Sequence, residues 1–208
     1  MDEMQKMLEE LSNAHGISGY EDSIRSIVKR LATPYCDEVY EDALGNVICK
    51  RGKGSPCVMV AAHMDEIGLM VRYIDDNGFL GFARLGGWFD QTLLNQRVVV
   101  HADGGDVYGV IGSKPPHVMK EEEKKTIVKA EDMFIDVGAS SPEEVEEMGI
   151  HVGTPITPDR KVVKLASTKI TGKCFDNRAG VACALYALRL LAEWDVDTCL
   201  YLVGTVQE

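Results

Sequence analysis

Four side chains of this sequence are of types that bind divalent metal ions or move protons: His63, Asp65, Asp176 and Glu208. An imidazole with several carboxylates and no thiolate is a ligand set suited to zinc, cobalt or manganese, and a carboxylate can bridge two such ions. Two ions about 3.5 to 4 Å apart are typical of metal-assisted hydrolysis. The residue types therefore favour hydrolytic metal chemistry.

The positions of these residues relative to apolar segments support the same interpretation. His63 and Asp65 directly follow the apolar segment 57–62, and Glu208 follows the apolar segment 199–206. In open α/β sheets the ligand crevice lies outside the carboxyl ends of the strands, so both strand ends would open there. Each residue also has a structural interpretation, with His63 as an ordinary strand-end histidine and Asp176 as a helix N-cap.

The segments that must position these residues read as an interrupted α/β domain. Apolar residues recur at helical spacing over 4–11, 24–31 and 181–191, and a Ser18–Glu21 capping box precedes the second of these helices. The unbroken apolar character of 57–62 predicts a central parallel strand that is covered on both faces. From 67 to 165 the chain reads instead as successive β-segments with turns and one short helix. We expect a discontinuous α/β domain, 1–66 and 166–208, split by a β-rich domain, 67–165.

Composition narrows the class of protein. The chain has 208 residues, of which 45% are hydrophobic and 26% charged, and its net charge is −11. Without a lysine-arginine stripe, nucleic acid is not an expected partner. No apolar run approaches the length of a membrane span, and the acidic N-terminus lacks the pattern of a secretory signal, so we expect a cytoplasmic protein without membrane association. Six cysteines without a CxxC pair disfavour a disulfide framework.

Four motifs in order along the chain resemble the M42 metallo-aminopeptidases, a group that includes glutamyl and deblocking aminopeptidases. The motifs are Ala62–Gly68 (AHMDEIG), Lys114–His117 (KPPH), Cys174–Gly180 (CFDNRAG) and Gly204–Glu208 (GTVQE). The resemblance implies a phosphorylase/hydrolase-like di-metal peptidase domain interrupted by a β-barrel dimerisation domain. It also implies assembly of homodimers up to a tetrahedral dodecamer.

The resemblance assigns a role to each candidate residue. His63 would be a ligand of one metal ion, and Asp176 would bridge both ions, which would be zinc or cobalt. Asp65 would orient His63, and Glu208 would be the general base that activates water to hydrolyse the N-terminal residue of a peptide.

The family pattern contains further ligands that have no counterpart here: a second glutamate, an aspartate and a histidine beyond the position of Glu208. We therefore expect this sequence to be an N-terminal portion of such an enzyme, with the C-terminal part of the α/β domain missing. The 208-residue chain itself would have little or no activity and weak metal binding. The alternative is a catalytically silent subunit or assembly fragment of an M42-type oligomer.

Overall fold

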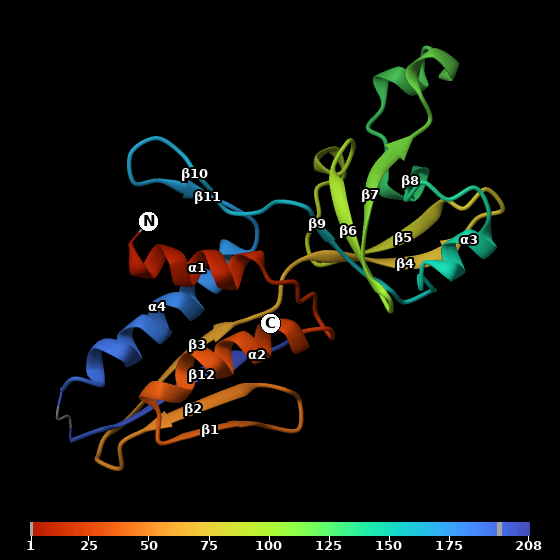
Figure 1. Ribbon diagram of the computed structural model, residues 1–208. Helices are drawn as coiled ribbons and strands as arrows, with labels where there is room; N and C mark the ends of the chain where they lie inside the picture. Colours follow the sequence, from red (N-terminus) through yellow and green to blue (C-terminus); the bar gives the residue numbers. More distant parts are fainter. Residues whose placement is uncertain (1, 195–196) are drawn as a thin grey trace. The chain divides into compact units, whose positions relative to one another are not determined.

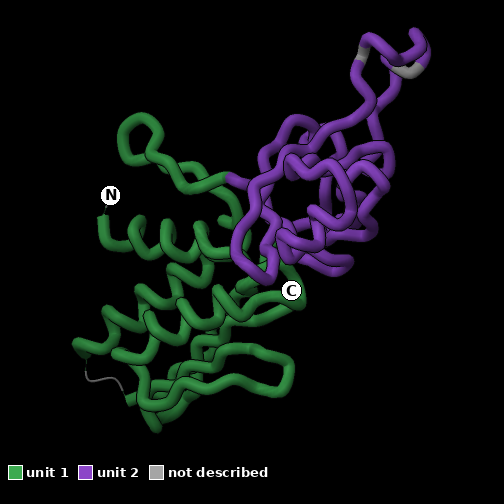
Figure 2. The backbone as a smooth tube through the Cα atoms, turned by 45° about the vertical axis from the view of Figure 1, so that its right-hand side comes forward, with its two compact units in different colours: residues 1–66, 160–208 green, residues 67–159 purple. Residues whose placement is uncertain are grey.

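The computed structural model describes residues 2–194 and 197–208 and divides the chain into two compact units. The first unit comprises Met1–Glu66 and Arg160–Glu208, and the second comprises Ile67–Asp159 (Figure 2). Residues 160–165, which we assigned from sequence to the inserted domain, belong to the first unit. There the short strand β10 (Val163–Lys164) pairs with β11 (Ile170–Thr171), and the backbone N–H of Val162 donates to Asn13 Oδ1 at 2.8 Å.

A four-stranded sheet forms the centre of the first unit. Its order is β1 (Glu38–Glu41), β2 (Val47–Arg51), β12 (Cys199–Thr205) and β3 (Cys57–His63). Strand β12 is antiparallel to β2 and parallel to β3, and Thr205 lies opposite His63. The prediction that β3 is covered on both faces is wrong, because β3 is the last strand in this order and its residues 57–61 are exposed.

Three helices, α1 (Glu3–Asn13), α2 (Asp22–Ala32) and α4 (Phe175–Leu191), lie beside this sheet (Figure 1). Their apolar residues form one buried cluster with residues of β2, β3 and β12. The cluster includes Leu11 from α1, Val28 from α2, and Leu185 from α4. Burying these side chains is what holds each helix in place, because short helices gain most of their stability from tertiary packing.

The second unit is a closed barrel with the strand order β4 (Gly68–Ile74), β5 (Leu80–Leu85), β8 (Met133–Asp136), β7 (Gly105–Ser113), β6 (Arg97–Ala102) and β9 (Pro155–Pro158). A closed sheet has no unpaired edge, and apolar residues of its strands fill the interior. The short helix α3 (Pro142–Glu147) begins with a Ser141 N-cap, whose side chain accepts from the N–H of Glu144. The structure confirms the predicted class, an α/β protein interrupted by a β-barrel.

Five short 3-10 helices complete the described elements: Thr33–Tyr35, Asp90–Thr92, Pro116–Val118, Glu123–Lys125 and Ala130–Asp132. Over the described ranges 2–194 and 197–208, none of the helices has the length and apolar character needed to cross a membrane.

Candidate active site

The parallel pairing of β3 and β12 brings two of the predicted segments to one edge of the sheet. Thr205 lies opposite His63, and the N–H of Met64 donates to the Thr205 carbonyl at 2.8 Å. The segment after β3 and the segment after β12 therefore leave the sheet side by side. Helix α4, which packs against β3, carries Asp176 near its start, where the backbone is not yet helical.

His63 lies between two carboxylates at this edge. Its Nδ1 is 3.2 Å from Asp65 Oδ1, and its Nε2 is 3.3 Å from Asp176 Oδ1. The side chains of His63 and Asp65 are 14% and 6% exposed, whereas that of Asp176 is 97% exposed. The imidazole is thus anchored on its buried side and open on the side that faces Asp176.

Asp65 is surrounded by hydrogen-bond donors. Besides the His63 ring, the Ser18 hydroxyl donates to Oδ2, and the backbone N–H of Glu208 donates to Oδ1 at 3.2 Å. A carboxylate that accepts from Nδ1–H leaves the Nε2 of a neutral imidazole with a free lone pair, here directed at Asp176. All four residues selected from the sequence therefore meet, with Asp65 linking His63 to the backbone of Glu208.

Ser18 takes a different role from the one the sequence suggested. The predicted Ser18–Glu21 capping box is wrong, because Glu21 itself is the residue before α2 and makes no side-chain cap. The side chain of Ser18 binds Asp65 instead. A spacing of serine and glutamate cannot distinguish these partners, because Asp65 is far away in sequence.

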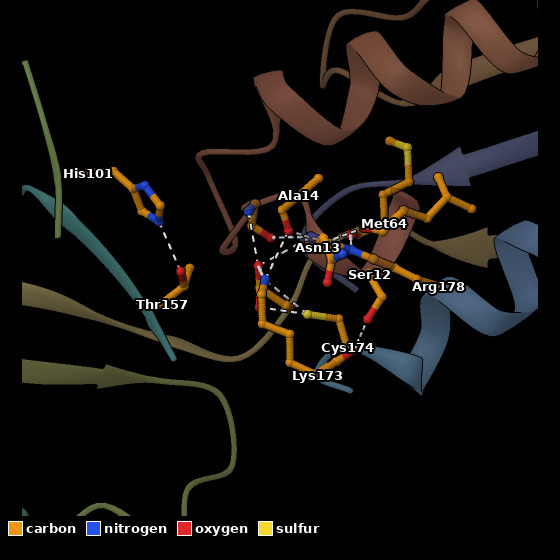
Figure 3. A network of polar contacts seen from close by, with 12 residues as sticks. Ser12, Asn13, Ala14, Met64, His101, Thr157, Lys173, Cys174 and Arg178 are labelled. Atoms are coloured by element: carbon orange, nitrogen blue, oxygen red, sulfur yellow. Dashed lines mark hydrogen bonds and ion pairs between the residues drawn. The ribbon is translucent and has the colours of Figure 1, made fainter. Parts of the chain in front are cut away.

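Arg178, two residues after Asp176, is fully buried beneath the site (Figure 3). Its guanidinium donates to the Met64 carbonyl from Nε at 2.9 Å and to Glu66 Oε1 from Nη2 at 3.4 Å. It also donates to the backbone carbonyls of Leu11, in the last turn of α1, and of Ala14 and Gly16, between α1 and α2. One side chain thereby ties the end of α1, the segment after β3 and the start of α4 together, using the fixed fork of donors that arginine provides.

Glu66 is the buried carboxylate of the same cluster. Lys173 Nζ lies 2.6 and 2.7 Å from its two oxygens, and the Cys174 thiol donates to Oε2 at 2.6 Å (Figure 3). Burial, with a further contribution from the Glu66 charge, raises the pKa of Cys174 to about 12, so Cys174 carries a proton rather than acting as a thiolate ligand. Glu66 and Arg178 lie inside the motifs and Lys173 lies beside one. The sequence analysis did not predict their roles, because a charged residue in a sequence carries no sign that it is buried.

In the second unit, His101 has its own partners. Its Nδ1 is 2.7 Å from Asp106 Oδ1. Its Nε2 is 2.9 Å from Thr157 Oγ1 (Figure 3). Both ring nitrogens are engaged by residues of the barrel strands.

The donors at the site fit a divalent metal ion in type but not in number. His63 Nε2 and the Asp176 carboxylate are ordinary ligands of first-row divalent ions, which take four or more donors. Within the described residues, no group of three or more His, Cys, Asp or Glu side chains is arranged to hold an ion. The described residues therefore supply two donors of a suitable type, but not a complete set of metal ligands.

Comparison with known proteins places the chain in a family. Residues 45–208, which contain all four candidate site residues, match the family model described as M42 glutamyl aminopeptidase. The lysyl aminopeptidase of Pyrococcus furiosus is 37% identical, with the match covering 98% of this chain and 59% of that protein.

Two solved structures extend the likeness to the fold. The TET aminopeptidase from a marine sediment archaeon of the Thaumarchaeota superposes with a TM-score of 0.95 at 41% identity, over 100% of this chain and 60% of that chain. The Pyrococcus horikoshii TET1 peptidase gives 0.90 at 33% identity, over 99% of this chain and 61% of that chain. The chain spans 56% to 59% of the length of four curated relatives that it matches. The match confirms the resemblance seen in the motifs, and the chain belongs to the M42 glutamyl aminopeptidase family.

Proposed function

We propose that this chain supplies part of the active site of a metal-dependent aminopeptidase that removes N-terminal residues from peptides. The observation that carries the proposal is the position of His63, held by Asp65 and facing Asp176 at the carboxyl ends of two parallel strands. A relative that matches nearly the whole chain is named a lysyl aminopeptidase, which supports the reaction class.

Zinc or cobalt would be held in part by His63, as a ligand of one ion, and by Asp176, which would be shared by two ions. Such ions, when bound, supply Lewis acidity toward the scissile carbonyl and toward water. Asp65 keeps the proton on Nδ1 of His63 and fixes the plane of the ring. Its second contact, to the N–H of Glu208, holds the backbone of that residue at the same edge.

Glu208 is the residue we assign to proton transfer. Glu208 follows β12 at the edge where β3 ends with His63, and it is exposed, as a group that meets substrate must be. As general base it would take a proton from the attacking water and pass it to the leaving amine.

Because the described residues provide two ligands, we propose that the 208-residue chain alone binds metal weakly and has little turnover. The experiment therefore compares this chain with a chimera in which residues 1–208 are joined to the remaining part of the Thaumarchaeota TET aminopeptidase. Both are assayed for release of amino acids from a panel of aminoacyl-anilides with added cobalt or zinc.

We expect the chimera to turn over in a chelator-sensitive manner, and Glu208→Gln to lower its kcat by about 10²- to 10⁴-fold, the usual contribution of a general base. Glu41→Gln is the matched control and should leave the rate unchanged. Glu41 is a carboxylate on strand β1 that pairs with Lys29 of α2. A folded chimera without turnover, or with turnover indifferent to chelator or to Glu208→Gln, would contradict the proposal.

The second candidate is a catalytically silent subunit of an M42-type oligomer, which the incomplete ligand set favours. Metal analysis and light scattering on one sample of the protein isolated from its source distinguish the two candidates. A stable oligomer without stoichiometric metal would favour the silent subunit, and about two ions per chain would favour the enzyme.

We also propose that the protein assembles with copies of itself through its barrel, as a dimer that builds up to a dodecamer. Among the solved neighbours, the Pyrococcus horikoshii TET1 peptidase can assemble into a tetrahedron or a large octahedral shell. On this chain, Tyr108 and Val110 of β7 are exposed apolar residues on one side of the strand.

The acidic net charge gives no support to a nucleic-acid partner, and six free cysteines fit a cytoplasmic location.

A further inference from the structure

The turn after β12 is held in an unusual way. Each of its three consecutive backbone N–H groups donates to a side-chain oxygen, and the three oxygens come from three separate segments. The pairs are Val206 with Asn46 Oδ1 at 3.0 Å, Gln207 with Glu21 Oε1 at 3.2 Å, and Glu208 with Asp65 Oδ1 at 3.2 Å. Backbone donors beyond a strand end must find partners, and here side chains supply all three.

Glu21 is the buried member of this set. It is 4% exposed, and the same Oε1 that accepts from Gln207 also accepts from the N–H of Gly19 at 2.9 Å. A buried carboxylate is tolerated where donors surround it, so Glu21 and the turn stabilise one another. Its backbone carbonyl meanwhile accepts the first hydrogen bond of α2, from Arg25 N at 2.9 Å, which fixes Glu21 to the helix.

The turn needs such support because of its backbone. Gln207 and Glu208 have φ values of +54° and +30°, in the left-handed region that residues other than glycine rarely adopt. Conformations of this kind persist where the surroundings over-determine them. The three acceptors provide that determination, and two of the three, Glu21 and Asp65, are buried carboxylates.

We propose that Glu21 is a positioning residue: it holds the turn 206–208 so that the carboxylate of Glu208 stands at the edge occupied by His63. The inference deepens the proposed function, because it rests on Glu208 as the general base. It assigns a role in the site to the loop before α2, a segment that lies outside the family match at residues 45–208.

The test measures amide hydrogen exchange by NMR in the 208-residue chain and three variants. Glu21→Ala removes the acceptor, Glu21→Gln retains a side-chain oxygen in the same place, and Asp22→Ala removes the neighbouring, 88% exposed carboxylate as the matched control. We expect the Gln207 amide to exchange at least about tenfold faster in Glu21→Ala, as for loss of a hydrogen bond to a charged group. It should change less than about threefold in the other two variants.

Amides of α4 and of the barrel report on folding in the same spectra. Equal Gln207 exchange in the unaltered chain and in Glu21→Ala would overturn the proposal. So would an acceleration shared equally by the α4 amides, because that result would make Glu21 a general stabiliser of the unit. If Glu21→Ala does not fold, fast Gln207 exchange in the folded Glu21→Gln variant or in the unaltered chain would overturn the proposal, and protection in both would support it.

A kinetic arm separates this inference from the proposed function. In the chimera, Glu21→Ala should lower kcat about tenfold with KM within twofold, and Glu21→Gln should restore most of the rate. A chimera with no turnover defeats the proposed function, while the exchange result still decides whether Glu21 holds the turn. An active chimera in which Glu21→Ala leaves kcat unchanged defeats the positioning role.

Discussion

Asp65 connects two functions that a sequence motif shows only as neighbours. Its Oδ1 contacts both the ring of His63 and the backbone N–H of Glu208. A displacement of either group therefore changes the hydrogen bond that holds the other. Replacing this carboxylate would therefore disturb the tautomer of the histidine and the placement of the glutamate together. Effects of residues that act as such a unit are strongly non-additive.

Two thiol pairs of the first unit provide a prediction at this scale. A hydrogen bond from Cys49, with a further contribution from the Arg51 charge, lowers the pKa of the half-buried Cys36. The contact with Cys199 raises the pKa of the exposed Cys57. Because a lowered pKa gives more thiolate at a given pH, we expect the rate of Cys36 alkylation to rise at lower pH than that of Cys57.

The test is iodoacetamide labelling followed by peptide mass spectrometry, repeated between about pH 6.5 and 10, a range that brackets the usual pKa of a thiol. It gives, for each of the two cysteines, the pH at which the alkylation rate reaches half its maximum, called the midpoint. Cys49→Ala should move the Cys36 midpoint upward and leave that of Cys57 in place. If exposure alone governs reactivity, Cys57 will lead at every pH and Cys49→Ala will change nothing.

Residue types identified the candidate site residues more readily than the residues that hold them in place. His63, Asp65, Asp176 and Glu208 could be selected from sequence because their types suit one chemistry and they follow apolar segments or precede a helix. The part played by Glu21 could not, because its hydrogen bond to Gln207 joins residues at opposite ends of the chain. Such long-range polar contacts leave no periodic trace in a sequence.

Three elements of the first unit meet at one buried guanidinium. Arg178 belongs to the start of α4, and its guanidinium contacts the end of α1 and the segment after β3. The start of α4 carries Asp176 and the segment after β3 carries Asp65, so the spacing between these two carboxylates depends on a side chain that touches neither.

Arg178→Met tests this dependence. The change retains much of the volume but removes the guanidinium donor from Glu66, which keeps Lys173, and from several backbone carbonyls. Losing a buried hydrogen bond to a charged group costs about 1.5 to 3 kcal/mol. Exchange of the α4 amides gives the change in unfolding free energy. Arg189→Met, on the same helix and paired with Glu3 at the surface, should cost less than about 1 kcal/mol. Similar losses in the two variants would show that the buried contacts contribute little.

Periodicity predicted the helices well, and strand neighbours poorly. The apolar residues spaced at 4–11, 24–31 and 181–191 fall within α1, α2 and α4. The buried face of an amphipathic helix is visible in its sequence because apolar residues recur every three to four positions. The unbroken apolar run of β3 suggested a doubly covered strand, yet Val58 to Val60 are exposed. What covers a strand depends on which other segments pair with it, and a single run of residues does not contain that information.

At the scale of the whole molecule, the exposed apolar residues of the barrel lead to a prediction about mass. We expect light scattering at micromolar concentration to give at least twice the 22.9 kDa of one chain. Tyr108→Asp, which places a charge on the apolar side of β7, should shift the protein toward the single chain. Tyr40→Asp on β1 is the matched control for an exposed tyrosine of the other unit. A monomeric unaltered chain, or equal effects of the two changes, would count against assembly through the barrel.

The antiparallel pairing of β4 with β9, Leu69 opposite Ile156, joins the first and last strands of the barrel. Closure of the barrel therefore brings the two ends of the inserted segment together, independently of the pairing of β3 with β12. The cost of closing a loop rises with its length by about 0.6 kcal/mol per doubling, and a formed barrel shortens the flexible path between β3 and β12 to roughly a third. A closed barrel thereby lowers the entropic cost of pairing β3 with β12. The edge that bears His63 and Glu208 depends on this parallel pairing.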